Sequence, residues 1–375
     1  MYIFYKLYGK IYNRGDIMEP YKAKKLPFDF NMNNEIIKLL CEAEETYGEY
    51  KGFLRSMNYD YKSFLECSFV SDIYYSFKID NTKLTKEFMF HTPYMIENND
   101  IIEFNNMKKA LLVGVNDVSR KSLTIDTYNK INRTLFLNCK KDNTTKGSGK
   151  FRKTQNYILK PGLAGSSVSF IPPVYSELND LMKNLLDYIN TSVDPYLVST
   201  ILTHFQYEKI HPYVSGNGKI GRLLIPVQFS FYKNEPPIIF ISESIDNLKN
   251  TYFTLLSGEV DEDVDKFVRF ILQCVIEQCN LNIKKIKRLN KIYKEDYDSF
   301  KEKIGGTTIY KVYPYIVRKI VFTTSDIVSE CNIHINSANK VLNKLVKEGY
   351  LIKEKKDGTN RVTFCYKNMY DVFIK

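Results

Sequence analysis

The feature that most constrains the fold is a glycine-containing turn between two helical patterns near the middle of the chain. Residues 194–210 begin with Asp194-Pro195, a capping residue followed by proline at the first helical position. They then place Leu197, Ile201 and Phe205 at helical spacing, and residues 219–232 restore that spacing after the turn. The turn Gly216-Asn217-Gly218 therefore leads into the N-terminus of a second helix.

This turn has the composition of an anion-binding site. The first N–H groups of a helix lack partners within the helix, and the helix dipole is positive at that end, so phosphate binds there. Lys219 and Arg222 are three residues apart and share one helical face, and His211 can accept a proton near neutral pH. Each residue alone has an ordinary structural explanation, but together they favour chemistry at phosphorus.

The stretch His211-Pro-Tyr-Val-Ser-Gly-Asn-Gly-Lys-Ile-Gly-Arg222 resembles the motif of the Fic family, His-x-Phe-x-(Asp/Glu)-Gly-Asn-Gly-Arg-x-x-Arg. Fic proteins transfer AMP from ATP to a protein hydroxyl group. The resemblance implies that His211 is the general base. It also implies that the nucleotide phosphates are held by Gly216, Asn217, Gly218, Lys219 and Arg222.

The stretch departs from the family motif at three positions. Tyr213 replaces Phe, Lys219 replaces the first Arg and loses its planar fork, and Ser215 replaces a carboxylate. The resemblance implies ATP as substrate with Mg²⁺ or Mn²⁺. Because hard cations prefer anionic oxygen, Ser215 is expected to be a weak metal ligand, directly or through water.

A second segment resembles the inhibitory motif (Ser/Thr)-x-x-x-Glu-(Gly/Asn) of class II Fic proteins. It is Ser76-Phe-Lys-Ile-Asp80-Asn81, at the end of a predicted helix. The resemblance implies that Asp80 pairs with Arg222 and competes with phosphate for its guanidinium. Without the main motif, the same residues would indicate only a helix end in solvent.

A third segment, Gly149-Lys150-Phe151-Arg152, resembles the Gly-x-Phe-Arg of the Fic flap. The flap is a β-hairpin whose edge can pair with an extended target segment, so the resemblance implies that these residues dock the protein substrate. Taken without the resemblance, the segment is an ordinary hairpin between helices.

Composition indicates a globular chain of two or three domains, since 44% of its 375 residues are apolar and 26% are charged. It lacks an 18-residue apolar run and a signal-peptide pattern, so we expect a cytoplasmic protein without membrane contact. Its seven cysteines form no Cys-x-x-Cys pair, which indicates reduced and mostly buried thiols.

The net charge of +11 is concentrated near the C-terminus, because residues 308–375 contain 12 basic and 6 acidic residues. Residues 336–347 are a predicted helix, and strands are predicted at 350–353 and 361–366. This pattern resembles the winged-helix domain that many Fic proteins carry. It implies contact with DNA or with protein through residues 308–375, although a solvated lysine-rich surface explains the charge equally well.

Apolar spacing also predicts the remaining helices and their order. We expect them at residues 33–57, 60–79, 106–115, 122–138, 176–188, 244–256 and 261–289, after an irregular segment at 1–32. The Gly305-Gly306 pair marks a boundary. The predicted domains are an N-terminal helical region at 1–110 with the inhibitory motif, a Fic core at 111–304 and a winged helix at 305–375.

We therefore expect a mainly α fold, a Fic-type helical bundle with a β-hairpin flap and a C-terminal winged-helix domain. The predicted function is transfer of AMP from ATP to Ser, Thr or Tyr hydroxyls of a protein target or of the chain itself, autoinhibited by Asp80. Removal of AMP and transfer of another nucleotide are open alternatives, as is a homodimer. The alternative of another class is an ATP-sensing DNA-binding regulator with a weak or inactive transferase site.

Overall fold

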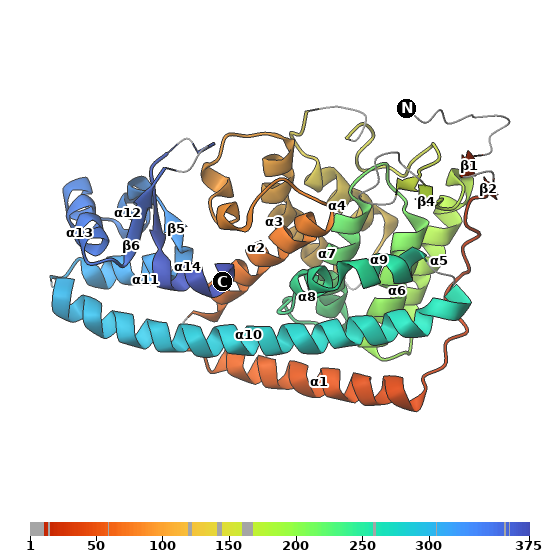
Figure 1. Cartoon of the computed structure of the whole chain (residues 1–375), viewed down its shortest axis with the longest axis horizontal. Coiled ribbons are helices and arrows are strands. Elements are labelled where there is room, and N and C mark those ends of the chain that lie inside the picture. Colours follow the sequence, from red (N-terminus) through yellow and green to blue (C-terminus); the bar gives the residue numbers. More distant parts are fainter. Residues whose placement is uncertain are drawn as a thin grey trace. The chain divides into compact units, whose positions relative to one another are not determined.

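The structure, a computed structural model, describes residues 11–13, 16–58, 60–118, 122–140, 145–159, 168–257, 260–304, 306–355, 358–359 and 361–375. It is mainly helical, as expected (Figure 1). The chain forms two compact units: Met1–Glu42 with Asn106–Cys274, and Ala43–Asn105 with Val275–Lys375. Each unit thus combines two separated segments, whereas the predicted division into 1–110, 111–304 and 305–375 follows chain order and stays a prediction.

The first unit contains two short antiparallel hairpins and a bundle of helices. One hairpin pairs β1 (Ile11–Asn13) with β2 (Asp16–Met18), within a segment expected to be irregular, and the other pairs β3 (Ile158–Leu159) with β4 (Val168–Phe170). The helices that lie wholly in this unit are α4 (Ile125–Leu135), α5 (Leu178–Thr191), α6 (Tyr196–Ile210), α7 (Asn217–Lys233), α8 (Ser242–Asn247) and α9 (Lys249–Ser257).

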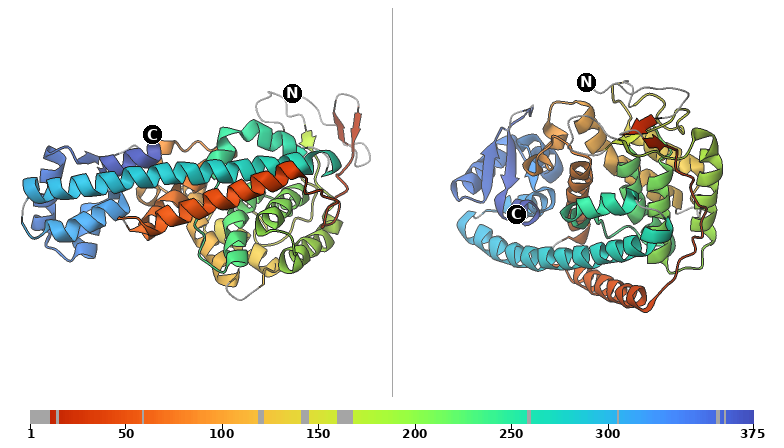
Figure 2. Two further views of the ribbon diagram at one scale, coloured as in Figure 1. Left: turned by 90° about the horizontal axis from the view of Figure 1, so that it is seen from below. Right: turned by 45° about the vertical axis from the view of Figure 1, so that its right-hand side comes forward.

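Three helices contribute residues to both units: α1 (Asn34–Arg55), α3 (Asn99–Val118) and α10 (Val260–Ile304). α1 runs beside α10 in every view (Figures 1 and 2). Within the first unit, Arg269 of α10 pairs with Glu35 of α1 at 3.0 Å, and within the second, the Lys287 ammonium lies 4.6 Å from the Phe53 ring centroid.

Some predicted helix bounds were wrong. α3 begins at Asn99, earlier than expected, because the Asn98 side chain accepts a hydrogen bond from the N–H of Ile101 and caps the helix. The helix predicted over 244–256 is divided into α8 and α9 at Leu248, whose φ of −125° is not helical. α10 continues to Ile304, past the predicted end at 289, and its Phe300 is fully buried.

The core of the first unit surrounds α6. Every residue from Leu197 to Ile210 is buried, so this helix is covered on all sides. α5 and α7 pack against it, and the Phe205 ring lies 4.9 Å from the ring of Phe267 in α10. A helix held in this way places its C-terminal residue accurately.

The second unit combines α2 (Tyr61–Ile79) with the C-terminal region. After the 3₁₀ turns at Lys86–Phe88 and Thr92–Tyr94, its further elements are α11 (Ile309–Lys319), β5 (Val321–Phe322), α12 (Thr324–Cys331), α13 (Ile335–Lys347), β6 (Leu351–Glu354), β7 (Thr363–Tyr366) and α14 (Lys367–Ile374). The three strands form an antiparallel sheet in the order β5-β7-β6. Two helices followed by a hairpin is the order that a winged helix requires, and that assignment stays a prediction.

The cysteines are unpaired, and all except the exposed Cys41 are buried, as the sequence indicated. Among the described residues, no helix combines the length and apolar character needed to cross a bilayer.

Candidate functional site

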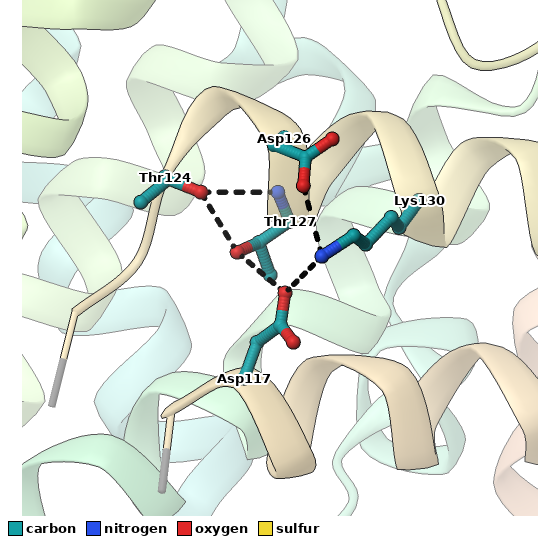
Figure 3. A network of polar contacts seen from close by, with 5 residues as sticks. All are labelled: Asp117, Thr124, Asp126, Thr127 and Lys130. Atoms are coloured by element: carbon teal, nitrogen blue, oxygen red, sulfur yellow. Dashed lines mark hydrogen bonds and ion pairs between the residues drawn. The ribbon is translucent and has the colours of Figure 1, made fainter. Parts of the chain in front are cut away.

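The site begins with α4, whose first turn is anchored to the end of α3 (Figure 3). The Thr124 hydroxyl accepts a hydrogen bond from the N–H of Thr127 at 3.2 Å and caps the helix. The Thr127 hydroxyl donates to Asp117 of α3 at 3.0 Å, and Lys130 pairs with both Asp117 and Asp126. This network fixes α4, which carries two of the side chains described below.

His211 ends α6 in an unusual backbone conformation. Its φ of 49° and ψ of 60° are left-handed, a region that residues with a Cβ rarely adopt. The N–H of His211 donates to the Tyr207 carbonyl at 3.0 Å, which closes the last turn of α6. The histidine that the motif assigns as base therefore lies where the chain leaves the central helix.

The turn that follows delivers the chain to α7. Gly216 is the N-cap residue, with φ of 80° and no side chain to cap the first N–H groups. A Cβ there would approach the Phe136 ring to 2.9 Å and Leu135 to 3.1 Å. Glycine is thus required both by conformation and by close approach, and the first turn of α7 presents backbone N–H groups to an anion.

Asn217 closes this loop from inside. Its side chain is 2% exposed and makes two hydrogen bonds to the backbone of Tyr213: Oδ1 accepts from the N–H at 2.9 Å, and Nδ2 donates to the carbonyl at 2.8 Å. These two bonds show that its side chain sets the shape of the loop. The role of Asn217 in nucleotide binding stays a prediction.

Three asparagines that sequence reasoning missed hold the loop from outside. Asn132 of α4 donates to the Ser215 carbonyl at 3.3 Å and accepts from the N–H of Gly149 at 2.6 Å. Asn129 accepts from the Tyr213 hydroxyl at 3.0 Å, and Asn156 donates to the Tyr213 carbonyl at 2.8 Å. These contacts connect the motif loop to α4 and to the segment that resembles the flap.

Within that segment, Gly149, Lys150, Phe151 and Arg152 have different environments. The Phe151 ring lies 5.5 Å from that of Tyr213, and Gly149 adopts a φ of 78°. Lys150 is exposed, whereas Arg152 is 2% exposed, and burial lowers its pKa to about 10. The Lys150 side chain therefore lies at the surface, whereas the guanidinium of Arg152 is directed into the protein, and the docking role of both residues stays a prediction.

A groove of about 470 Å³ lies beside this segment. Its lining comes from α4, from residues 150–153, from the 3₁₀ turn at Tyr175–Glu177 and from the start of α5. It contains no carboxylate: Ile125, Asn129, Lys150, Phe151, Arg152, Lys153, Tyr175, Ser176, Leu178 and Asn179. The volume is that of a small-ligand or peptide side-chain site.

Arg222 lies in the first turns of α7 and is 3% exposed. Behind it, His204 makes two contacts, one with the Gly221 carbonyl at 3.1 Å through Nδ1 and one with the Tyr252 hydroxyl at 3.0 Å through Nε2. Burial, and then the charge of Arg222, lower the pKa of His204 to about 3. The ring is therefore neutral, donates from Nδ1 and accepts from Tyr252, which is a core residue as expected.

The loop does not offer the donor set of a resident divalent-cation site. Ser215 supplies a neutral hydroxyl, and residues 211–222 contain no carboxylate. Among the residues that the structure describes, no three His, Cys, Asp or Glu side chains gather in a metal-binding cluster. The weak role of Ser215 as a ligand of Mg²⁺ or Mn²⁺ stays a prediction.

The inhibitory segment belongs to the other compact unit. Ser76 is buried within α2, Asp80 is its C-cap residue, and Asn81 follows with a left-handed φ of 61°. The N–H of Thr82 donates to the Phe77 carbonyl at 3.0 Å, which completes the helix end. The pairing of Asp80 with Arg222 stays a prediction.

Comparison with known proteins agrees with this geometry. Residues 122–228 match the sequence model of the Fic/DOC family. Protein adenylyltransferase Fic of Drosophila willistoni is 27% identical over 136 residues, which are 36% of this chain and 24% of that protein. Protein adenylyltransferase Fic of Nematostella vectensis is 24% identical over 219 residues, 55% of this chain and 47% of that protein. The chain thus spans about a quarter to a half of these relatives.

A solved structure shows the same fold. A Fic family protein from Desulfovibrio desulfuricans G20 superposes with a TM-score of 0.57 over 90% of this chain and 97% of that chain, at 17% sequence identity. At this identity the likeness concerns the fold alone.

Proposed function

We propose that the protein, whose residues 122–228 match the Fic/DOC family model, transfers AMP from ATP to a hydroxyl group of a protein, its own chain included. The observation that carries the proposal is the position of His211 at the end of α6, in the same short loop as the N-terminus of α7. The proposed proton acceptor, His211, is therefore only a few residues from the helix N-terminus that would bind the phosphates. The two curated relatives named above are protein adenylyltransferases.

In the proposed reaction the target hydroxyl oxygen attacks the α-phosphorus of ATP while His211 takes its proton. A bond forms between that oxygen and phosphorus, and the bond from phosphorus to the pyrophosphate oxygen breaks. Lys219, Arg222 and the N–H groups of Gly218 and its neighbours stabilise the phosphate charge. Pyrophosphate leaves with the metal ion that accompanied ATP.

We place the protein substrate along residues 149–153, with the β3-β4 hairpin supplying its pairing edge. Support comes from the groove lined by Lys150 and Lys153, which lies next to the segment that contacts Tyr213. Lys150 and Phe151 would contact the target, while the Arg152 side chain would act from behind.

We also propose that Asp80 inhibits transfer by pairing with Arg222, with Ser76 and Asn81 shaping the end of α2. A carboxylate at that guanidinium competes with phosphate, and the shorter side chain of Asp makes the competition weaker than with Glu. In the reverse direction, Asp80 would position the water that removes AMP from a modified target.

The test is label transfer from ATP carrying the label on the α-phosphate. Wild-type protein, Asp80→Gly and the double variant Asp80→Gly/His211→Ala are incubated with Mg²⁺ or Mn²⁺ and a mixture of candidate proteins. We expect protein-bound label to rise in Asp80→Gly and to disappear in the double variant.

The matched control uses ATP labelled on the γ-phosphate, which leaves with pyrophosphate and should label nothing. Label from the γ-phosphate would instead indicate a phosphotransferase. Failure of all three proteins to transfer α-label, together with normal ATP binding, would favour the second candidate function.

That second candidate is a DNA-binding regulator that senses ATP. The observation that favours it is the solvent face of α13, which contains no acidic residue. Apart from Ile335 at the start of the helix, its exposed side chains are polar or basic: Asn336, Asn339, Lys340, Asn343, Lys344 and Lys347. Asparagine can read adenine in the major groove and lysine can contact phosphates.

Binding of the whole protein to duplex DNA at two salt concentrations tests this function. We expect binding that weakens steeply with salt, and a shallower salt dependence in Lys340→Gln/Lys347→Gln, since each lost phosphate contact lowers the slope by about 1. Absence of binding at low salt would leave residues 308–375 as a protein-interaction module.

Other features of the proposal rest on the resemblance alone. They are a homodimer, Mg²⁺ or Mn²⁺ as the ion delivered with ATP, and adenine as the base. The proposed cytoplasmic location rests instead on the sequence, which lacks an 18-residue apolar run and a signal-peptide pattern. Competition by unlabelled GTP, CTP and UTP in the label-transfer assay tests the choice of base.

A further inference from the structure

Arg152 has a set of contacts that surface docking does not explain. The side chain is 2% exposed, and its three donor groups all reach backbone carbonyls: Nε donates to His211 at 3.0 Å, Nη1 to Thr154 at 3.1 Å and Nη2 to Pro173 at 2.5 Å. The backbone N–H of Arg152 also donates to the Pro212 carbonyl at 2.9 Å. Arg152 therefore binds the chain before β3, at Thr154, and after β4, at Pro173. It also binds the backbone at His211 and Pro212.

The energetics of this arrangement indicate a specific role. A buried charge is costly unless it is well hydrogen-bonded, and in the described part of the chain no carboxylate pairs with Arg152. Its compensation comes from carbonyl dipoles, including the negative end of α6, where a cation is favourable. A lysine offers a point charge and cannot reach three carbonyls in one plane.

The backbone of His211 needs such support. A left-handed φ of 49° at a residue with a Cβ is strained, and a strained conformation persists only when its surroundings fix it. Arg152 binds the carbonyls of two successive residues, that of His211 through its side chain and that of Pro212 through its backbone N–H. These two bonds hold the direction in which the imidazole leaves the backbone.

We infer that Arg152 is a positioning residue that holds the His211 backbone at a fixed place relative to the base of the β3-β4 hairpin. If the hairpin presents the target hydroxyl, Arg152 keeps that hydroxyl and the proton acceptor at a constant separation. The consequence for catalysis rests on the proposed function, whereas the consequence for His211 itself does not.

The kinetic test compares Arg152→Gln and Arg152→Lys with a matched control, Gln155→Ala. Gln155 also fastens the hairpin base, by donating to the Pro172 carbonyl at 2.7 Å, and it has no hydrogen bond to His211 or Pro212. We expect Arg152→Gln to lower kcat by about 10²-fold, the scale of a small misplacement of a reacting group, with the Kd for ATP little changed. Arg152→Lys should recover part of that loss, and Gln155→Ala should stay close to wild type.

A second measurement does not depend on activity. The chain has only four histidines, so their ring signals can be resolved by NMR in protein labelled at histidine, and His211→Ala assigns the relevant one. We expect the His211 signal to shift and broaden in Arg152→Gln while the other three keep their positions, and Gln155→Ala to leave all four in place. If Arg152→Gln does not fold, Arg152→Lys provides the same comparison.

The two measurements separate the inference from the proposed function. An Asp80→Gly protein that transfers no label, together with a wild-type His211 signal that responds to Arg152→Gln, refutes the function and supports the positioning role. An unchanged His211 signal in folded Arg152→Gln and Arg152→Lys overturns the inference, whatever the transfer rate.

Discussion

Replacement of Gly216 by alanine measures how tightly the turn into α7 is specified. Two costs are expected at this position. A side chain at φ of 80° loses about 1–2 kcal/mol in the left-handed region. The new Cβ would also lie 2.9 Å from the Phe136 ring and 3.1 Å from Leu135, both buried, and such overpacking costs about 1–3 kcal/mol. Their sum predicts a loss of about 2–5 kcal/mol in the free energy of unfolding.

Two other glycines separate these costs. Gly147 has a φ of 84°, and a Cβ added there would have no atom within 4 Å, so Gly147→Ala should lose only the conformational part, about 1–2 kcal/mol. Gly52 lies inside α1 with no neighbour within 4 Å and no positive φ, so Gly52→Ala should gain up to about 1 kcal/mol from helix propensity.

The assay is thermal and urea unfolding followed by circular dichroism, since the chain has no tryptophan for fluorescence. We expect the order Gly52→Ala, wild type, Gly147→Ala, Gly216→Ala from most to least stable. If Gly216→Ala is as stable as Gly147→Ala, contacts of the new Cβ with Phe136 and Leu135 carry no cost. If it is as stable as wild type, the left-handed backbone conformation at position 216 carries no cost either.

Three further changes test the surroundings of the loop. Ser215→Asp should raise label transfer at low Mg²⁺, because a carboxylate binds the ion better than a hydroxyl; an unchanged Mg²⁺ titration would exclude position 215 as a ligand. Asn132→Ala leaves the buried N–H of Gly149 and the part-buried carbonyl of Ser215 without their partner, at about 1–3 kcal/mol for the buried group and less for the other, measurable by urea unfolding. Because the pKa of His204 is lowered on folding, the unfolded chain binds more protons than the folded chain between pH values of about 6.5 and about 3. The free energy of unfolding therefore falls as the pH drops through this range. His204→Gln should therefore show a smaller difference in urea midpoint between pH 7 and pH 5 than wild type, and an equal difference would count against a neutral buried ring.

The helices on both sides of the motif could be predicted because their signals are local. Apolar spacing, a Pro at the start of α6 and glycines before α7 are all read within a few residues, and the observed helices begin and end close to the expected positions. The extra length of α10 was missed because its later part is rich in lysine, although residues such as Phe300 continue the buried face.

The side chains that hold the loop could not be predicted in the same way. Asn129 and Asn156 reach Tyr213 from 84 and 57 residues away, and nothing in the local sequence separates them from asparagines on the surface. Arg152 was assigned to a docking surface because residues 149–152 resemble the Fic flap. Its burial depends on carbonyls from two distant turns, which only the folded chain brings together.

The contact between Tyr213 and Asn129 has a consequence for how related sequences can vary. The hydroxyl that distinguishes this chain from the Phe of the family motif donates to the Asn129 side chain at 3.0 Å. In a relative with Phe at the position of Tyr213, the side-chain oxygen of the residue matching Asn129 has no such donor. Selection to keep asparagine there is therefore weaker. The identities of the two positions should therefore change together along the lineage, as a correlated pair in a sequence alignment.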